Sequence, residues 1–431
     1  MRFFSTNNRQ HEVGLAEAII KGLAPDQGLY FPIQIPRLRE EFIKSLPGKS
    51  FKEIGYEVIG NLFSEDLSVQ QIKELVDHTL AFDAPLVKVE PDFYSQELFH
   101  GPTLAFKDFG ARFCSKLMSM LLKNQAQKVR VLVATSGDTG SAVANGFLGV
   151  DGVEVIILFP KGKVSKLQEK QFTTLGENIK CLEIDGVFDD CQRLVKQAFL
   201  DQELNEKMVL TSANSINIAR WIPQALYYFR AYSLLEVYQK KLVVSVPSGN
   251  FGNLAAGILA MKMGLPIDQF VASTNLNKIV PDYLNGSVFH PQASVQTISN
   301  SMDVGDPSNF PRLLALFNQD DFELRKIVKG YFFDDHQTRE AIQKIHKLGY
   351  LADPHGAVGY LGLKSFMEEN PGFQGIFLET AHPGKFREVV EETLNMKVDL
   401  PDRLEKFLKG KKESESMDGD FLSFKNYLKG N

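Results

Sequence analysis

The sequence predicts an α/β fold in which mostly parallel strands form a sheet covered by helices on both faces. From Lys128 onward, short apolar runs rich in β-branched residues alternate with stretches of helical length. Strands that alternate with helices favour βαβ units, whose parallel strands are buried on both sides. Two of these strands, 129–134 and 242–246, lead directly into glycine-containing loops. Because ligands of such folds bind at the carboxyl ends of the strands, the two loops are candidate sites.

The composition limits the class of protein. A chain of 431 residues is too long for one simple core, so we expect two or three domains. The formal net charge of -5 provides no basic surface for nucleic acid or a membrane. No apolar run approaches the roughly 20 residues of a membrane span, and the N-terminus lacks a signal-peptide pattern. Cys114, Cys181 and Cys191 have no Cys-x-x-Cys spacing, which favours a reducing compartment. We expect a cytoplasmic protein that acts on a small molecule.

Residues 1–95 form the first predicted domain, which is small and mainly helical. Apolar residues at helical spacing predict helices over 13–23, 51–63 and 69–81. The aromatic segment 28–32 either packs against an active site or forms an exposed turn. This domain contains no catalytic constellation.

The other elements follow in order and are divided into a second domain, 96–215, and a third, 216–431. Strands are predicted at 129–134, 153–159, 179–184, 208–211, 242–246 and 375–379. Helices are predicted at 141–147, 165–175, 189–199, 218–238 and 254–263. The charged run after Leu408 is predicted to be a solvated loop or a frayed linker.

Lys107 is the first candidate for chemistry. It lies between Phe106 and Phe109, and Pro102 and Thr103 are predicted to form a turn that starts a helix. An ammonium group among aromatic residues loses hydration, so its charged form is disfavoured. Such a lysine can act as an amine nucleophile and form a Schiff base with a carbonyl. Most lysines are solvated surface residues, so this segment alone does not decide its role.

The two glycine loops are suited to anions. The loop 135–140 (Thr-Ser-Gly-Asp-Thr-Gly) offers hydroxyls and amides for a carboxylate, and 248–252 (Ser-Gly-Asn-Phe-Gly) offers backbone N–H groups for a phosphate. Neither loop matches a nucleotide-binding motif, and either alone could be a tight strand-to-helix turn. Together with Lys107, and with all three expected at one edge of a sheet, they supply what pyridoxal phosphate on an amino acid requires.

These motifs resemble those of the threonine synthases, pyridoxal-phosphate enzymes that share the tryptophan-synthase β fold. The resemblance covers nearly the whole chain except the charged tail, and it is carried by separated motifs in the right order: 28–32, 100–109, 135–140, 214–217, 248–252 and 380–385. It implies two doubly wound, mostly parallel open sheets with helices on both faces, plus the N-terminal domain.

The resemblance also implies roles for individual residues. Lys107 would form the Schiff base with pyridoxal phosphate and then move the protons of the substrate Cα and Cβ. The remaining cofactor contacts would be Asp138 at the ring hydroxyl, Thr380 at the ring nitrogen, and Gly249, Asn250, Phe251, Gly252 and Asn253 at the phosphate. The substrate carboxylate would be held by Thr135, Ser136 and Thr139, and the substrate phosphate by Asn214, Ser215 and Arg220. A guanidinium suits a phosphate because its planar fork binds two oxygens at once.

The implied reaction converts O-phospho-L-homoserine and water into L-threonine and phosphate by γ-elimination and β-addition of water. The main alternative is a phospho-lyase on the same scaffold that releases 2-oxobutyrate, ammonia and phosphate. A serine or threonine dehydratase is disfavoured by Arg220, because its substrate has no phosphate. A cofactor-binding protein without activity is disfavoured by the intact Lys107 and both loops.

Some points stay open at this stage. The histidines other than His100 and His382 show no metal-ligand spacing. The oligomeric state is not determined, with a monomer or a weak dimer favoured, and neither is the protonation state of Asp138. Basic residues with no assigned role are Lys161, Lys163, Lys166, His100 and His382.

Overall fold

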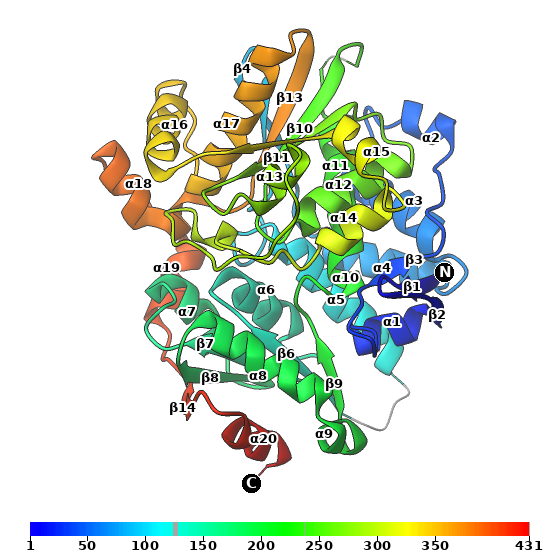
Figure 1. The fold of residues 1–431 in the computed structure, drawn as a ribbon, viewed down its shortest axis with the longest axis vertical. Coiled ribbons are helices and arrows are strands. Elements are labelled where there is room, and N and C mark those ends of the chain that lie inside the picture. Colours follow the sequence, from blue (N-terminus) through cyan, green and yellow to red (C-terminus); the bar gives the residue numbers. More distant parts are fainter. Residues whose placement is uncertain (124–127, 237, 431) are drawn as a thin grey trace. The chain divides into compact units, whose positions relative to one another are not determined.

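The computed structural model describes residues 1–123, 128–236 and 238–430 (Figure 1). The chain divides into two compact units, and each unit is built from separated segments. The lysine unit, named after Lys107, consists of Met1–Pro32, Lys107–Arg220 and Leu400–Asn431. The loop unit, named after the glycine loop at 248–252, consists of Ile33–Phe106 and Trp221–Asp399. The three predicted domains, 1–95, 96–215 and 216–431, are continuous stretches of sequence, whereas the two units are defined by compactness. These three domains stay a prediction.

The lysine unit contains a five-stranded sheet in the order β14-β8-β7-β6-β9, and each neighbouring pair is parallel. Its strands are β6 (Val129–Ala134), β7 (Val153–Pro160), β8 (Ile179–Asp185), β9 (Val209–Ser212) and β14 (Glu415–Asp418). Its helices are α1 (Leu15–Lys21), α5 (Lys107–Leu122), α6 (Asp138–Phe147), α7 (Lys166–Thr173), α8 (Phe188–Leu200), α9 (Gln202–Lys207), α10 (Ile218–Trp221, at the boundary), α19 (Asp402–Lys409) and α20 (Phe421–Lys429).

Both faces of this sheet are buried, as the alternation of helices and strands predicts. Leu132, Ile156 and Leu182 point to one face, where Leu194 of α8 and Phe424 of α20 complete an apolar cluster. The alternating residues of the same strands are buried on the other face, and α6 contacts β6 and β7. Figure 1 shows these helices flanking the strands.

A small antiparallel sheet in the order β2-β1-β3 also belongs to the lysine unit. Its strands are β1 (Arg2–Ser5), β2 (Asn8–Gly14) and β3 (Tyr30–Pro32). The sequence did not predict it, because β3 is three residues long and β2 is mostly exposed, which leaves little apolar alternation to detect.

The loop unit contains a six-stranded sheet in the order β12-β11-β10-β13-β5-β4, in which only β4 is antiparallel to its neighbour. Its strands are β4 (Leu86–Glu90), β5 (Phe93–Glu97), β10 (Lys241–Pro247), β11 (Gln269–Thr274), β12 (Val328–Phe332) and β13 (Phe373–Glu379). Its helices are α2 (Glu40–Lys44), α3 (Phe51–Phe63), α4 (Val69–Thr79), η1 (Ile222–Gln224), α11 (Ala225–Ser233), α12 (Gly252–Lys262), α13 (Ile279–Leu284), η2 (Asn300–Met302), α14 (Phe310–Leu316), α15 (Asp321–Ile327), α16 (Asp335–Lys347), α17 (Pro354–Glu369), η3 (Pro383–Phe386) and α18 (Arg387–Leu394).

The sheet of the loop unit is also covered on both faces. Tyr360 of α17 packs with Val243 of β10 and Phe377 of β13 on one face. On the other face Gly257 of α12 lies so close to the sheet that an added Cβ would be 2.7 Å from the Phe270 ring. The predicted α/β class with two mostly parallel sheets is therefore confirmed. None of the described helices is long and apolar enough to cross a membrane.

The single long helix predicted over 218–238 is wrong. The chain forms α10, then the 3-10 turn η1, and then α11, which ends at Ser233. Pro223 has no N–H to donate and its ring crowds the preceding turn, so a continuous helix is broken there. Residue 237, inside the predicted range, lies outside the described residues.

The solvated tail predicted after Leu408 is also wrong. β14 pairs with β8 in parallel, with Glu415 opposite Leu182. α20 then buries Phe424 and Leu428 in the apolar cluster of the lysine unit. The helical spacing of apolar residues in α20 was present in the sequence, but the charged run before it favoured a solvated reading.

Candidate active site

Lys107 and Asp138 form an ion pair at the starts of two helices. Lys107 is the first residue of α5 and Asp138 is the first residue of α6. The Lys107 Nζ lies 3.8 Å from Asp138 Oδ2, and the two side chains are 18% and 5% exposed. The turn predicted at Pro102 and Thr103 is present, but α5 begins only at Lys107, four positions after Thr103, and Leu104 between them has φ +57°. The pair places an amine nucleophile next to a carboxylate in a largely buried setting.

The loop at 135–140 is a tight turn organised by the Thr135 hydroxyl. Its Oγ1 accepts hydrogen bonds from the N–H groups of Gly137 at 3.0 Å and Gly140 at 2.8 Å. A Cβ at Gly140 would lie 2.5 Å from the Thr135 methyl carbon, so the turn requires glycine there. Ser136 is exposed and Thr139 is half-buried. The structure thus leaves Ser136 and Thr139 accessible and places Thr135 inside the turn.

Asn214 and Ser215 follow β9, next to the loop that follows β6. The Asn214 Nδ2 donates to the Ala134 carbonyl at 3.4 Å, which joins the ends of the two strands. Arg220 is 3% exposed and donates to the Ala213 carbonyl. A Cβ at Gly110 of α5 would lie 3.0 Å from the Arg220 Nε, so the guanidinium is packed against that helix.

Arg220 therefore braces the turn that carries Asn214 and Ser215. Burial lowers the pKa of its guanidinium from the usual value. Because β7, β6 and β9 are parallel neighbours, the loops at 135–140 and 213–217 leave the same carboxyl edge of the five-stranded sheet. These residues form the candidate site of the lysine unit.

The second glycine loop belongs to the loop unit and is a backbone cradle. It connects β10 to α12, with Phe251 in the left-handed conformation (φ +61°) immediately before the helix. A Cβ at Gly249 would lie 2.9 Å from the Met302 Cα and 3.0 Å from the Ser301 carbonyl oxygen. Both obstacles are backbone atoms that cannot swing away. The N-terminus of an 11-residue helix and a side-chain-free loop fit a phosphate group.

Thr380 lies beside this cradle at the end of a neighbouring strand. It follows β13, which is the parallel neighbour of β10, and it is 7% exposed. Among the described residues its hydroxyl makes no hydrogen bond, although its backbone carbonyl accepts from the Phe106 N–H at 2.9 Å. A buried hydroxyl without a partner and a cradle that a Cβ would fill together fit pyridoxal phosphate, which offers a ring nitrogen and a phosphate.

The side-chain oxygen of Asn253, in the first turn of α12, is held by two tyrosines, which leaves its backbone N–H as the group predicted to bind phosphate. The Asn253 Oδ1 accepts hydrogen bonds from the hydroxyls of Tyr227 and Tyr228, both at 2.7 Å. Burial raises the pKa of both tyrosines well above the ordinary value, which keeps them as donors. The side-chain oxygen is thereby anchored in the core beneath the helix.

A buried histidine supports the segment on which Gly249 rests. The Ser301 N–H donates to His355 Nε2 at 3.2 Å, and His355 Nδ1 lies 2.8 Å from Asp353 Oδ2. Because an N–H can only donate, Nε2 is the acceptor and Nδ1 carries the proton toward Asp353. Asp353 also caps α17 by accepting from the Gly356 N–H at 2.7 Å. His355 is thus tied to a helix start and holds the backbone next to the loop.

A second set of contacts holds the loop from the other side. The Asn250 Oδ1 accepts from the N–H and hydroxyl of Ser308 at 3.1 and 3.0 Å, and the Asn250 carbonyl accepts from the Asn309 N–H at 3.2 Å. Arg312 donates to Asn309 Oδ1 at 2.8 Å, and burial lowers its pKa to about 9. The sequence does not reveal these supports, because His355 at the start of α17 and Ser308 and Asn309 in a loop have no local pattern that indicates their distant partners.

The histidines with no assigned role lie at the same carboxyl edge of the six-stranded sheet. His100 Nε2 lies 2.7 Å from Glu97 Oε2. His382 Nδ1 accepts from the Gly384 N–H at 3.0 Å, which caps η3, and burial lowers its pKa to about 4. Lys385 of η3 donates to the Thr103 carbonyl at 2.9 Å. These contacts fix the loops around Thr380.

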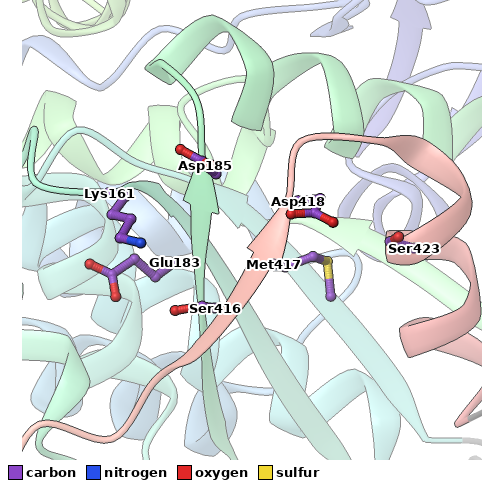
Figure 2. A pocket seen from close by; sticks show the side chains of 7 residues that line it. All are labelled: Lys161, Glu183, Asp185, Ser416, Met417, Asp418 and Ser423. Carbon is purple, nitrogen blue, oxygen red and sulfur yellow. The ribbon is translucent and has the colours of Figure 1, made fainter.

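The two glycine loops and the lysines at 161–166 do not all follow strands of the same sheet. The two glycine loops do not share one sheet edge, because one follows β6 of the five-stranded sheet and the other follows β10 of the six-stranded sheet. Lys163 and Lys166 are exposed. Lys161 lines a cavity of about 310 Å³ at the β8–β14 edge, where Figure 2 shows its amine beside the Glu183 carboxylate. None of the predicted site residues lines this cavity.

Comparisons with known proteins cover the whole described fold. The family "Pyridoxal-phosphate dependent enzyme" matches residues 80–373, "Threonine synthase N terminus" matches 2–80, and "Threonine synthase, C-terminal" matches 356–428. The threonine synthase of Haemophilus influenzae is 44% identical over 429 residues, which is 99% of each chain. The crystal structure of threonine synthase from Escherichia coli has a TM-score of 0.94 at 42% identity and full coverage of both chains. The pyridoxal-phosphate-bound threonine synthase from Brucella melitensis has a TM-score of 0.92 at 32% identity, covering 100% of this chain and 99% of that one.

Proposed function

The chain belongs to the threonine synthase family of pyridoxal-phosphate-dependent enzymes, and from this premise we propose that it converts O-phospho-L-homoserine and water into L-threonine and phosphate. The enzyme is a pyridoxal-phosphate-dependent lyase. The observation that carries the proposed chemistry is the Lys107 amine at the start of α5, 3.8 Å from the Asp138 carboxylate.

Each unit contains residues that we propose to bind the cofactor. Pyridoxal phosphate, when bound, draws electrons away from the carbon atoms next to the substrate nitrogen and so eases the loss of their protons. Lys107 would be the amine that binds the cofactor aldehyde, and Asp138 would bind the ring hydroxyl. The backbone N–H groups of 249–253 would hold the phosphate. The Thr380 hydroxyl, buried and free of other bonds in the described chain, would donate to the ring nitrogen.

The substrate residues come from the carboxyl edge of the five-stranded sheet. Ser136 and Thr139 bind the amino-acid carboxylate with their hydroxyl and backbone groups, in a turn whose shape Thr135 maintains. Asn214 and Ser215 bind the substrate phosphate, and Arg220 adds its positive charge from behind the turn that they occupy. The loop at 135–140 thereby binds the carboxylate of the substrate and the loop at 213–217 binds its phosphate, and both loops lie at the same edge of the sheet.

Lys107 also moves the protons of the reaction. Its nitrogen takes a proton from Cα and then from Cβ of the substrate, and the neighbouring Asp138 carboxylate stabilises the charge that the nitrogen gains. The C–O bond at Cγ breaks and phosphate leaves. Water then supplies a hydroxyl at Cβ. The three protons released by Cα, Cβ and this water go to Cγ, back to Cα and to the departing phosphate, so the atoms of substrate and water are all found in threonine and phosphate.

Product analysis tests this proposal. Purified protein loaded with pyridoxal phosphate is given O-phospho-L-homoserine, and threonine, 2-oxobutyrate and phosphate are measured together. Threonine and phosphate in equal amounts are expected. Phosphate with 2-oxobutyrate and no threonine would show a phospho-lyase that uses the same cofactor residues.

We retain two further expectations as part of the proposal. A cytoplasmic location is tested by cell fractionation, and a monomer or weak dimer by light scattering across a range of protein concentrations. A stable tetramer would contradict the second expectation.

A further inference from the structure

Gln168 is a buried side chain in the first turn of α7 and belongs to no motif that the sequence singled out. It is 2% exposed. Its Nε2 donates to Asp138 Oδ1 at 2.9 Å, while the other oxygen of Asp138 lies 3.8 Å from the Lys107 amine. One carboxylate therefore lies between an amide donor and the lysine nitrogen.

The orientation of the Gln168 amide is fixed from its other end. Ser165 caps α7 by accepting from the Gln168 N–H at 3.3 Å, and its hydroxyl donates to Gln168 Oε1 at 2.9 Å. Because Oε1 accepts there, the NH₂ group is the part of the amide that faces Asp138. An NH₂ group only donates, so the contact favours the ionised form of the Asp138 carboxyl.

The space for this contact depends on Gly137. Its φ is +144°, and a Cβ there would lie between 2.6 and 2.8 Å from three atoms of the Gln168 amide. The Ser141 hydroxyl donates to the Gln168 carbonyl at 3.2 Å, which ties α6 to α7. The amide is thus enclosed by the turn that also carries Asp138.

We propose that Gln168 is a positioning residue for the reaction, which holds Asp138 ionised and directed toward the Lys107 nitrogen. This inference rests on the proposed function, in which Lys107 binds the cofactor and moves the substrate protons. A negative carboxylate at this distance stabilises a proton on the lysine nitrogen. Gln168 thereby sets the pH range in which that nitrogen keeps its proton.

A role limited to packing makes a different prediction. A buried amide needs hydrogen-bond partners, and for stability any acceptor serves. Under a packing role, the loss of the amide lowers stability and leaves the protonation of the Lys107 nitrogen unchanged. Under the positioning role, the charge of the replacement decides the result.

Three variants of the cofactor-loaded protein separate these readings. Gln168→Met keeps the length of the side chain and removes the donor. Gln168→Glu keeps the shape and the acceptor for Ser165, but it brings a second carboxylate to Asp138. Gln171→Met is the matched control, since Gln171 is buried on the same helix. The measurements are the absorbance of bound cofactor as a function of pH, and the site of borohydride reduction by peptide mapping.

As the pH falls, protonation of Asp138 should change the absorbance of the bound cofactor. The pH midpoint of this change is expected to rise by about one unit in Gln168→Met, because the charged form of Asp138 loses a hydrogen-bond donor. A larger rise is expected in Gln168→Glu, in which two carboxylates share one proton. Equal midpoints in both Gln168 variants, the control and the parent protein would overturn the inference. If Gln168→Met does not fold, Gln168→Glu decides alone. Absence of the reduced cofactor on Lys107 in the parent protein would instead overturn the proposed function.

Discussion

The lysine unit and the loop unit present their site residues in different ways. In the lysine unit the groups are side chains, namely the Lys107 amine, the Asp138 carboxylate and the hydroxyls of the turn at 135–140. In the loop unit the cradle at 249–253 is backbone, and its shape comes from Ser301 and Asn309 far along the chain. The comparison teaches that a side-chain site fails when its own residue is changed, whereas a backbone site also fails when its supports are changed.

The lysine unit is tested most strongly by Lys107→Ala. Without the amine, the variant loses both the cofactor bond and the group that moves protons, so kcat should fall by at least about 10³-fold. Steady-state phosphate release measures the loss, and borohydride should no longer fix the cofactor to the chain. Lys161→Ala, at the cavity of Figure 2, is the matched control and should keep its activity. Retained activity in Lys107→Ala would remove the side-chain half of the comparison.

The loop unit is tested by Gly249→Ala, which adds one methyl group to the cradle. The new Cβ meets the backbone of Ser301 and Met302, so the loop must shift and its N–H groups no longer converge. Loss of one or two hydrogen bonds to a charged phosphate predicts cofactor binding weaker by about 10 to 100-fold. Fluorescence titration with pyridoxal phosphate measures this affinity. Gly60→Ala in α3, where an added Cβ has open space, should bind as the parent does.

The support of the cradle is tested by His355→Ala. The Ser301 N–H loses its acceptor, and the segment against Gly249 is released. We expect cofactor affinity to fall by about 3 to 10-fold with little change in kcat at saturating cofactor, because a buried donor left unpaired costs about 1 to 3 kcal/mol, shared between folding and binding. His355→Gln, which can accept the same N–H, should recover part of the loss. His346→Ala, on the exposed side of α16, is the control. An unchanged affinity in His355→Ala would show that the cradle keeps its shape without this support.

Acid should weaken the loop unit through His382, with an effect on stability and none expected on the chemistry. Burial lowers its pKa from 6.5 to about 4, so the unfolded chain binds a proton between these values while the folded chain does not. The stability from neutral His382 is therefore complete above about pH 6.5 and is lost as the pH falls toward 4. Between pH 7 and 5 the free energy of unfolding should fall by about 1 to 2 kcal/mol more in the parent than in His382→Asn. Urea denaturation at both pH values measures this free energy. An equal fall in the parent and in His382→Asn would argue against a buried neutral ring.

The fold was largely predictable because its parallel strands are buried on both faces and have clear bounds. The strand predicted at 129–134 matches β6, and the helix predicted at 51–63 matches α3. The failures have local causes. Pro223 interrupts an apolar periodicity that otherwise continues, and the charged residues after Leu408 conceal the pairing of β14. Secondary-structure propensity depends on residues close in sequence, whereas the pairing of β14 depends on a strand that is distant in sequence.

The residues of the candidate site could be predicted only where a local sequence motif contains them. Lys107, Asp138 and the glycine at 249 are recognisable in their motifs, and their roles stay a prediction. The structure shows that Lys107 pairs with Asp138 and that Gly249 packs against the backbone of Ser301 and Met302. Gln168 and His355 have no such signal, because a lone glutamine or histidine has the same local pattern in a core as beside a cofactor. Their partners, Asp138 and Ser301, are 30 and 54 positions away.

The pairing of β14 with β8 has a consequence for the newly made chain. Glu415 faces Leu182, so β8 is synthesised long before the strand that covers it. Until then, β8 is an uncovered edge whose free N–H and C=O groups can accept a strand from another chain. Such late, long-range parallel pairing is slow to form. We therefore expect nascent chains that end before β14 to aggregate more readily than the full chain, which sedimentation of translated fragments measures.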